Sequence, residues 1–129
     1  IATVLVSVLT TPEIEPTPEE LAEIRAKPHG LIAAVKERVG DKPTFLTFDI
    51  DFVDPAYAPG TGTPEVGGFT SLEALTLMRA LTTVNFTGFD IVEVLPAYDH
   101  GEITAYLAAN IVFEFLSILA LQKNRKEGK

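Results

Sequence analysis

Runs of β-forming residues alternate along this chain with segments that carry helix-start and helix-end residues. Strands are predicted over residues 2–9, about 43–49 and about 88–95. Capping boxes predict helices over 17–27 and from 70 to about 83. Gly40 is typical of the residue after a helix and predicts the end of one over about 29–39, and a last helix is expected from about 102 onward. Strands that alternate with helices are typical of an α/β domain with a parallel sheet. A length of 129 residues suits one domain.

The charge balance limits the classes of partner. Eighteen acidic residues against ten basic ones give a net charge of -8. This balance argues against a nucleic-acid partner, because such a surface must offset phosphate charge, and it is compatible with a cationic small ligand or a metal ion. The absence of cysteine excludes a thiolate metal site and favours a reducing, cytoplasmic setting. The chain begins at Ile1 and lacks the basic start of a signal peptide, so we expect a processed, trimmed or partial product.

Residues 103–122 are apolar and long enough to span a bilayer. Asn110, Glu114 and Ser117 nevertheless follow one another at i, i+4 and i+7. One polar stripe on an apolar helix is typical of a helix that packs on a sheet with one edge in water. We therefore expect no membrane partner.

Two acids stand at the end of the second predicted strand, in "TFLTFDID" at 44–51. Residues i and i+2 of a strand point to the same face, so Asp49 and Asp51 are expected to project together at the carboxyl end of the strand. Ligands of open α/β sheets bind at that edge. Two adjacent carboxylates need a shared proton or a cation, and hard oxygen ligands suit Mg²⁺, Mn²⁺ or Ca²⁺. A strand end with solvated acids is the alternative.

Other metal and phosphate motifs fit the same acids less well. An EF-hand loop that starts at Asp49 would need Gly and Glu where Asp54 and Gly60 stand. "TFLTFDIDFV" also resembles the haloacid-dehalogenase phosphatase motif, with Asp49 as nucleophile and Asp51 as acid/base. That family needs a later lysine and a downstream acidic pair, whereas lysines after the motif occur only in the polar tail. This phosphatase remains the alternative enzyme.

Two longer segments carry a more specific resemblance. "FDIDFVDPAYAPGTGTPEVGGFT" at 48–70 resembles the ureohydrolases, the arginase and agmatinase family, and "GFDIVEVLPAYDHGEITAYLAANIVFEFL" at 88–116 resembles the last strand and last helix of that family. "GTGTPE" and "PAYDHGEIT" favour the agmatinases. The resemblance is clearest over residues 44–120. It implies the C-terminal half of a three-layer arginase-like α/β fold, with a parallel sheet flanked by helices, and makes residues 1–129 a single partial domain.

The resemblance also implies an activity and residue roles. It implies hydrolysis of a guanidino compound, agmatine above all, to urea and an amine. The full-length enzyme would be a homo-oligomer and would hold two Mn²⁺ ions, which lower the pKa of a bound water. Asp49 would bridge both ions and Asp51 would bind one. Glu93 would pair with the substrate guanidinium through two parallel hydrogen bonds. His100 would line the pocket or orient a carboxylate. Without the resemblance, the residues themselves favour a surface-loop histidine at His100 and a solvated strand-end acid at Glu93.

The chain departs from the family pattern in its histidines. The Gly-Gly-Asp-His and Asp-Ala-His-x-Asp segments of the family do not occur, and His29 and His100 are the only histidines. Two metal ligands are therefore expected here and no catalytic acid/base, so the chain alone is expected to be inactive. A degenerate half-domain that pairs with another chain is the contrasting hypothesis. In the loop from 52 to 69, Asp54 is expected to hold backbone groups rather than metal, and Thr61 and Thr63 are expected to bond the loop to itself.

Overall fold

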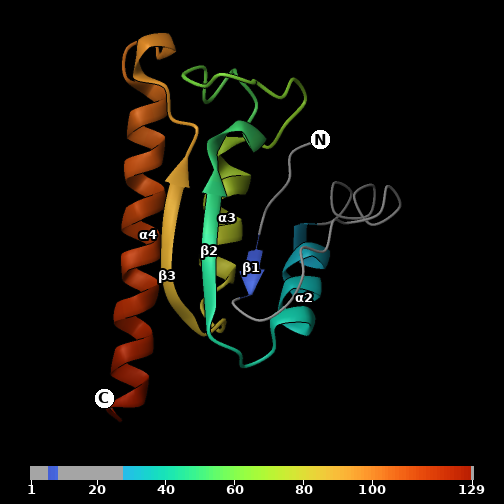
Figure 1. The fold of residues 1–129 in the computed structure, drawn as a ribbon, viewed down its shortest axis with the longest axis vertical. Coiled ribbons are helices and arrows are strands. Elements are labelled where there is room, and N and C mark those ends of the chain that lie inside the picture. The colour runs from blue at the N-terminus through green and yellow to red at the C-terminus, as the bar shows by residue number, and fades with distance from the viewer. Residues whose placement is uncertain (1–5, 9–27, 129) are drawn as a thin grey trace.

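The structure is a computed structural model that describes residues 6–8 and 28–128. The described residues form three strands and three helices, joined by loops and two short 3-10 turns (Figure 1). The strands are β1 (Val6–Val8), β2 (Thr44–Asp49) and β3 (Phe86–Val92), the helices are α2 (Pro28–Val39), α3 (Ser71–Ala80) and α4 (Ile103–Lys126), and the 3-10 turns are Ile50–Phe52 and Pro96–Tyr98. The predicted elements from residue 29 onward are confirmed. The helix predicted over 17–27 and most of the first predicted strand lie outside the described residues.

The sheet has the order β1-β2-β3. β2 and β3 are parallel, with Leu46 opposite Phe89 and Asp49 opposite Val92, as the sequence predicts. β1 pairs with β2 in the antiparallel direction, so the prediction of a parallel sheet is wrong for this pair. A short run of β-branched residues can pair in either direction, so the composition of β1 does not reveal whether it is parallel or antiparallel to β2. The parallel pair brings the carboxyl ends of β2 and β3 to one edge of the sheet.

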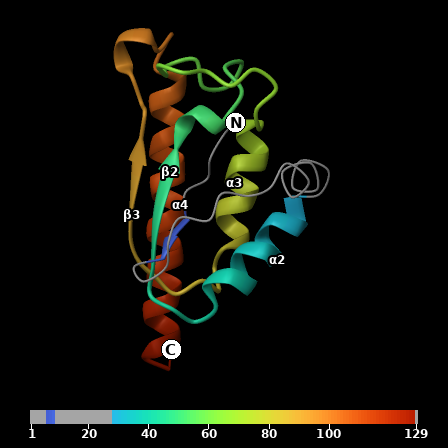
Figure 2. The ribbon, with the colours of Figure 1, turned by 45° about the vertical axis from the view of Figure 1, so that its right-hand side comes forward.

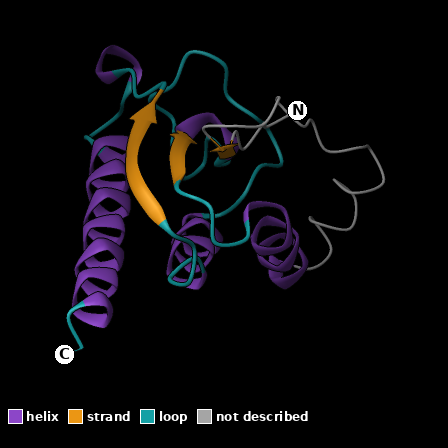
Figure 3. Ribbon diagram, turned by 60° about the horizontal axis from the view of Figure 1, so that its bottom comes forward, coloured by secondary structure: helices purple, strands orange, loops and turns teal. Residues whose placement is uncertain are grey.

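Helices α3 and α4 pack side by side on one face of the sheet, and α2 lies next to α3 (Figures 1, 2 and 3). The described residues thus form the sheet and one helical layer. Both belong to the three-layer fold that the resemblance implies. Phe115 of α4 lies at the centre of the core, with its ring 3.9 Å from the ring of Phe89 and 5.1 Å from that of Phe86. The core also contains Leu46 and Phe48 of β2 and Met78 of α3.

The predicted helix ends agree with the observed hydrogen bonds. Glu73 N donates to the Thr70 hydroxyl at 3.2 Å, and Thr70 N donates to the Glu73 carboxylate at 2.8 Å, which completes the capping box of α3. Gly40 follows α2 with φ +53°, a left-handed conformation that glycine adopts without strain. The local sequence therefore fixes where these two helices start and stop.

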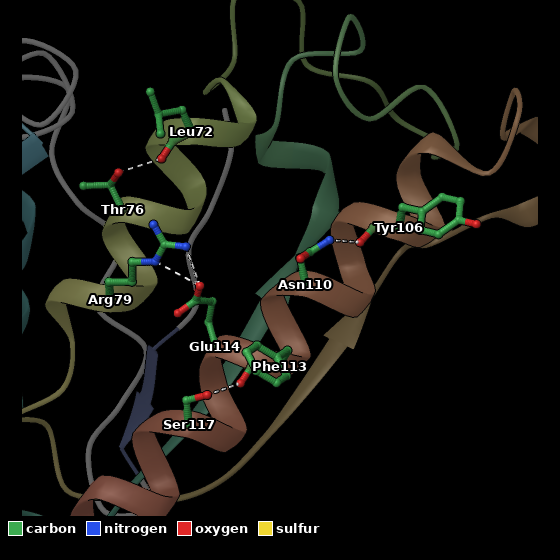
Figure 4. A network of polar contacts seen from close by, with 8 residues as sticks. All are labelled: Leu72, Thr76, Arg79, Tyr106, Asn110, Phe113, Glu114 and Ser117. Carbon is green, nitrogen blue, oxygen red and sulfur yellow. Dashed lines mark hydrogen bonds and ion pairs between the residues drawn. The ribbon is translucent and has the colours of Figure 1, made fainter.

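Helix α4 uses its polar side chains locally. Asn110 and Ser117 donate to the carbonyls of Tyr106 and Phe113, both at 2.8 Å, and Glu114 accepts from Arg79 Nε at 2.9 Å (Figure 4). In the described part of the chain, α4 is the one helix with the length and composition to cross a membrane. One face of it is buried on the sheet, which confirms the predicted packing. That no membrane partner exists stays a prediction.

Candidate functional site

The site expected from the sequence lies where β2 and β3 end. Asp49 is the last residue of β2, and the chain turns at once into the 3-10 helix Ile50–Phe52. The Asp49 carboxylate accepts a hydrogen bond of 2.9 Å from Asp51 N and so caps this turn. The prediction that Asp49 and Asp51 share one face of a continuing strand is therefore wrong, because the strand ends before Asp51. Their closeness comes from the capped turn instead.

The acids at this edge repel one another. Burial raises the pKa of Asp49 above its usual range, the hydrogen bond from Asp51 N acts in the opposite direction, and the negative charges of Asp51 and Glu93 raise the pKa further. Three carboxylates from two neighbouring strand ends thus lie within electrostatic reach. A proton or a nearby cation relieves repulsion of this kind.

Asp51 is the least satisfied of these acids. Its side chain is buried, with the residue only 9% exposed. Its Oδ2 atom accepts from the Thr63 hydroxyl, whereas Oδ1 is buried without a hydrogen-bond partner. A buried polar atom without a partner is costly, so natural structures seldom leave one. A hard cation at Oδ1 would supply the missing interaction, and the donors present therefore fit a divalent ion such as Mn²⁺ or Mg²⁺.

The described residues hold part of such a site. Among them, no three histidine, cysteine, aspartate or glutamate side chains come together in a group that could hold a metal ion. Hard divalent cations take about six ligands. Asp49 and Asp51 can therefore supply some ligands of a metal centre, and the others must come from elsewhere.

Glu93 follows the last residue of β3 and has φ +62°. This left-handed conformation is uncommon for a residue with a side chain, and strained residues of this kind cluster at functional sites. The side chain is exposed, so its carboxylate is open to a ligand beside Asp49. The structure ends β3 at Val92, earlier than the predicted end near residue 95, and the strained residue is the physical reason. No pattern in the sequence signals this backbone strain.

The part of the loop at 58–63, which is rich in glycine, threonine and proline, is fastened to the start of α4. Gly60 N donates to the Thr104 hydroxyl at 2.7 Å, and Leu95 N donates to Gly60 O at 2.8 Å. A Cβ at position 60 would lie 2.6 Å from the Asp99 Cβ, so only glycine fits this approach. Asp99 in turn accepts from Thr104 N at 3.0 Å and from Ala105 N at 2.9 Å. Sequence reasoning missed Asp99 and Thr104, because their contacts join segments far apart in the chain.

The remaining loop residues match the expectations in part. Asp54 accepts from Ala56 N and Gly67 N, both at 2.8 Å, which confirms that it holds the loop. Thr63 bonds to Asp51 rather than to its own loop, and the buried Thr61 hydroxyl has no partner, so the expected self-bonding of these threonines is wrong. His100 is exposed in the turn before α4. Its place in a substrate pocket stays a prediction.

The chain is similar to known proteins over most of its length. The model of the arginase family matches residues 17–117. An agmatinase of Escherichia coli O1:K1 / APEC is 57% identical over 93 residues, which are 72% of this chain and 30% of that enzyme. The chain thus spans about a third of the length of the curated relatives it matches.

Solved structures show the same likeness in three dimensions. A hypothetical agmatinase from Burkholderia thailandensis superimposes with a TM-score of 0.76 at 45% identity, over 79% of this chain and 33% of that one. Proclavaminate amidino hydrolase from Streptomyces clavuligerus gives a TM-score of 0.72 at 45% identity, over 79% and 34%. The family model covers most of the chain and the relatives share its fold, and the chain therefore belongs to the arginase family.

Proposed function

We propose that this chain supplies the strand-end portion of a ureohydrolase active site, which hydrolyses a guanidino compound to urea and an amine. The observation that carries the proposal is the acidic edge of the sheet, where the buried Asp51 Oδ1 atom has no hydrogen-bond partner. Agmatine is the proposed substrate, because relatives at 57% identity are agmatinases. The net charge of -8 would also attract this cationic compound.

Asp49 and Asp51 are the proposed Mn²⁺ ligands. Bound divalent ions would act as Lewis acids and would supply a water of lowered pKa at neutral pH. The chain itself orients both carboxylates: Asp51 N fixes Asp49, and the Thr63 hydroxyl fixes the second oxygen of Asp51. Hydrogen bonds of this kind set the orientation of ligands and tune metal affinity.

Glu93 is the proposed guanidinium-binding residue. A carboxylate can accept two parallel N–H bonds from a planar guanidinium, an arrangement that gives both strength and orientation. The exposed side chain of Glu93 is within electrostatic reach of Asp49, so a guanidinium bound there would lie next to the proposed metal ligands. Substrate and metal would then share the carboxyl edge of the sheet.

Two alternatives to the proposed ureohydrolase function are the phosphatase and the degenerate half-domain. The match of the arginase family over residues 17–117 argues against the haloacid-dehalogenase phosphatase, whose motif falls inside the matched region. The degenerate half-domain is favoured by one observation, the absence among the described residues of a three-ligand group. A cytoplasmic location and a homo-oligomeric parent enzyme stay predictions.

A chimera separates the enzyme from the degenerate half-domain. The 93-residue segment of Escherichia coli agmatinase that matches this chain would be replaced by the corresponding residues of this chain. We expect the chimera to release urea from agmatine with Mn²⁺ and not in a metal-free control. Circular dichroism and elemental analysis would establish folding and Mn²⁺ content. A folded, Mn²⁺-loaded chimera without turnover would contradict the proposal.

A further inference from the structure

Gly60 is held on several sides by the segment that leads from β3 into α4. Its N–H donates to the Thr104 hydroxyl at 2.7 Å, its carbonyl accepts from Leu95 N at 2.8 Å, and a Cβ on it would come within 2.6 Å of the Asp99 Cβ. Figures 1 and 2 show the loop after β2 and the turn before α4 meeting beyond the carboxyl ends of β2 and β3. The loop is therefore anchored at Gly60, three residues before Thr63.

Thr104 supplies the side chain that holds this anchor. The residue is 0% exposed, and its hydroxyl oxygen is the acceptor for Gly60 N. Burial acts to raise the pKa of Asp99, but hydrogen bonds from Thr104 N, Ala105 N and the Thr104 hydroxyl outweigh it and lower the pKa below its usual range. The charged Asp99 carboxylate therefore holds the first turn of α4 and the Thr104 hydroxyl together, with the hydroxyl oxygen left to accept from Gly60 N.

Thr63 connects the anchored segment to the proposed metal ligand. Its hydroxyl donates to Oδ2 of Asp51. Thr63 is exposed in the described part of the chain, whereas Gly60 and Thr61 before it are buried. Residues with few buried contacts are held weakly, so their position depends on the anchored residues beside them. The place of the Thr63 hydroxyl relative to Asp51 thus depends on the anchor at Gly60.

Loss of the Thr104 hydroxyl would leave the buried N–H of Gly60 without its acceptor. A buried donor without a partner is costly, so the loop would shift until this N–H reaches water or another acceptor. Such a shift would carry Thr63 away from Asp51, whose Oδ1 atom already has no hydrogen-bond partner. Groups that orient a metal ligand also tune the affinity of the site.

We propose that Thr104 is a positioning residue for the metal site, and that it sets the affinity for Mn²⁺ through Gly60, Thr63 and Asp51. Its side chain is buried, so it acts on the site through the loop rather than through contact with metal or substrate. The inference rests on the proposed function, because Asp51 is a proposed Mn²⁺ ligand there.

Titration of the chimera with Mn²⁺ tests the proposal without relying on turnover. The metal-free chimera and its variants would be titrated with manganese chloride by isothermal titration calorimetry. Thr104→Val keeps the shape of the side chain and removes the hydroxyl, so the Kd for Mn²⁺ should rise about tenfold, the lower end of the effect of removing a group that orients a ligand. Thr104→Ser keeps the hydroxyl and should restore most of the affinity.

Thr44→Val is the matched control. Thr44 is also 0% exposed, and its hydroxyl donates to Lys42 O at 2.9 Å at the opposite end of β2. Thr104→Val and Thr44→Val each remove one buried hydroxyl, so both should lower the denaturant midpoint, but Thr44→Val should leave the Kd for Mn²⁺ unchanged. Circular dichroism would show that each variant folds. If Thr104→Val does not fold, Asp99→Asn takes its place, because it weakens the hold on the Thr104 hydroxyl and should also raise the Kd.

A double-mutant cycle tests the route through Thr63. If Thr104 acts on Asp51 by way of Thr63, Thr104→Val should change the Kd little in a chimera that already carries Thr63→Val. Residues that act independently would give losses that add. Additive losses would therefore overturn the proposed route.

Two further results would overturn the inference while the proposed function stands. These are an unchanged Kd for Mn²⁺ in the folded Thr104→Val chimera, and an equal rise of the Kd in the Thr44→Val control. A chimera without these substitutions that binds no Mn²⁺ would contradict the proposed function itself, and the inference with it.

Discussion

Asp51 shows at the scale of one residue how the site differs from a group of solvated acids. Solvated carboxylates at a strand end would satisfy both oxygens with water. Asp51 instead is buried, accepts from Thr63 with one oxygen and leaves the other without a partner. The capped turn at Asp49 holds this arrangement. The geometry thus suits a cation, whereas Asp54, three residues further on, has its carboxylate occupied by backbone groups.

The first prediction compares these acids within the chimera. Asp49→Ala should reduce urea release by about a hundredfold or more, because loss of a metal ligand should cost at least as much as loss of a residue that supports one. Asp54→Ala removes two loop hydrogen bonds and no ligand, so it should lower stability and leave the activity of the folded enzyme nearly unchanged. Activity would be measured by urea release and folding by circular dichroism. Equal losses of activity in two folded variants would refute the assignment.

At the scale of elements, the structure fastens the loop at 58–63 to the start of α4. Gly60 lies so close to Asp99 that a Cβ would come within 2.6 Å of its Cβ and 2.9 Å of its Cα. The Thr104 hydroxyl binds Gly60 N in the same place. Asp99 and Thr104 therefore position the loop that carries Thr63, the partner of Asp51.

The second prediction uses two glycines of this loop. Gly60→Ala should lower the free energy of unfolding by about 1–3 kcal/mol, because the added methyl group must displace the Asp99 backbone. Gly62→Ala is the matched control, since nothing lies within 4 Å of a Cβ there, and it should change stability by less than about 1 kcal/mol. Urea denaturation of both variants would measure the difference. A Gly60→Ala chain as stable as the Gly62→Ala chain would show that the contact is not tight.

The third prediction concerns the pH dependence of the loop. The backbone N–H groups of Ala56 and Gly67 lower the pKa of Asp54 below its usual range. A depressed pKa in the folded state stabilises the protein above the unfolded pKa, near 3.9, and this contribution is lost as pH falls through the folded value. The stability advantage of the wild type over Asp54→Asn should thus be constant from pH 5 to 7 and shrink below about pH 4. Denaturant midpoints measured across this range would check it, and an advantage that grows toward low pH would contradict it.

Local signals predicted most of the described elements. The capping box of α3, the glycine after α2 and the apolar run of β2 act within a few residues of one another, so the sequence displays them. The turn at Asp51 was missed because strand alternation was carried past Asp49, whose carboxylate ends the strand. The contact between Gly60 and Thr104 joins residues 44 positions apart, and no periodicity encodes it. The strand-end pattern predicted Asp49 and Asp51 as a cation site, whereas the role of Glu93 came from the family resemblance. The structure brings these three acids to the ends of β2 and β3.

At the scale of the whole molecule, the chain spans about a third of the length of its relatives. We propose that it contains only the strand-end part of a complete active site. The fourth prediction is that this chain alone releases no urea from agmatine with Mn²⁺ above a metal-free control. Its described residues bring no three metal-binding side chains together, so water would have to fill most of the coordination sphere. Measurable Mn²⁺-dependent urea release by the purified chain would show that the site is more complete than proposed.

Glu93→Gln in the chimera tests the central claim most directly, because it separates substrate binding from metal binding. The substitution keeps the shape of the side chain but presents an NH₂ group to the N–H donors of a guanidinium. A charged hydrogen-bonded pair is worth about 1.5–3 kcal/mol, so kcat/KM for agmatine should fall roughly tenfold to a hundredfold. Mn²⁺ content, measured by elemental analysis, should stay unchanged. Loss of manganese together with activity would place Glu93 in the metal site, and an unchanged kcat/KM would make it a solvated acid at the end of β3.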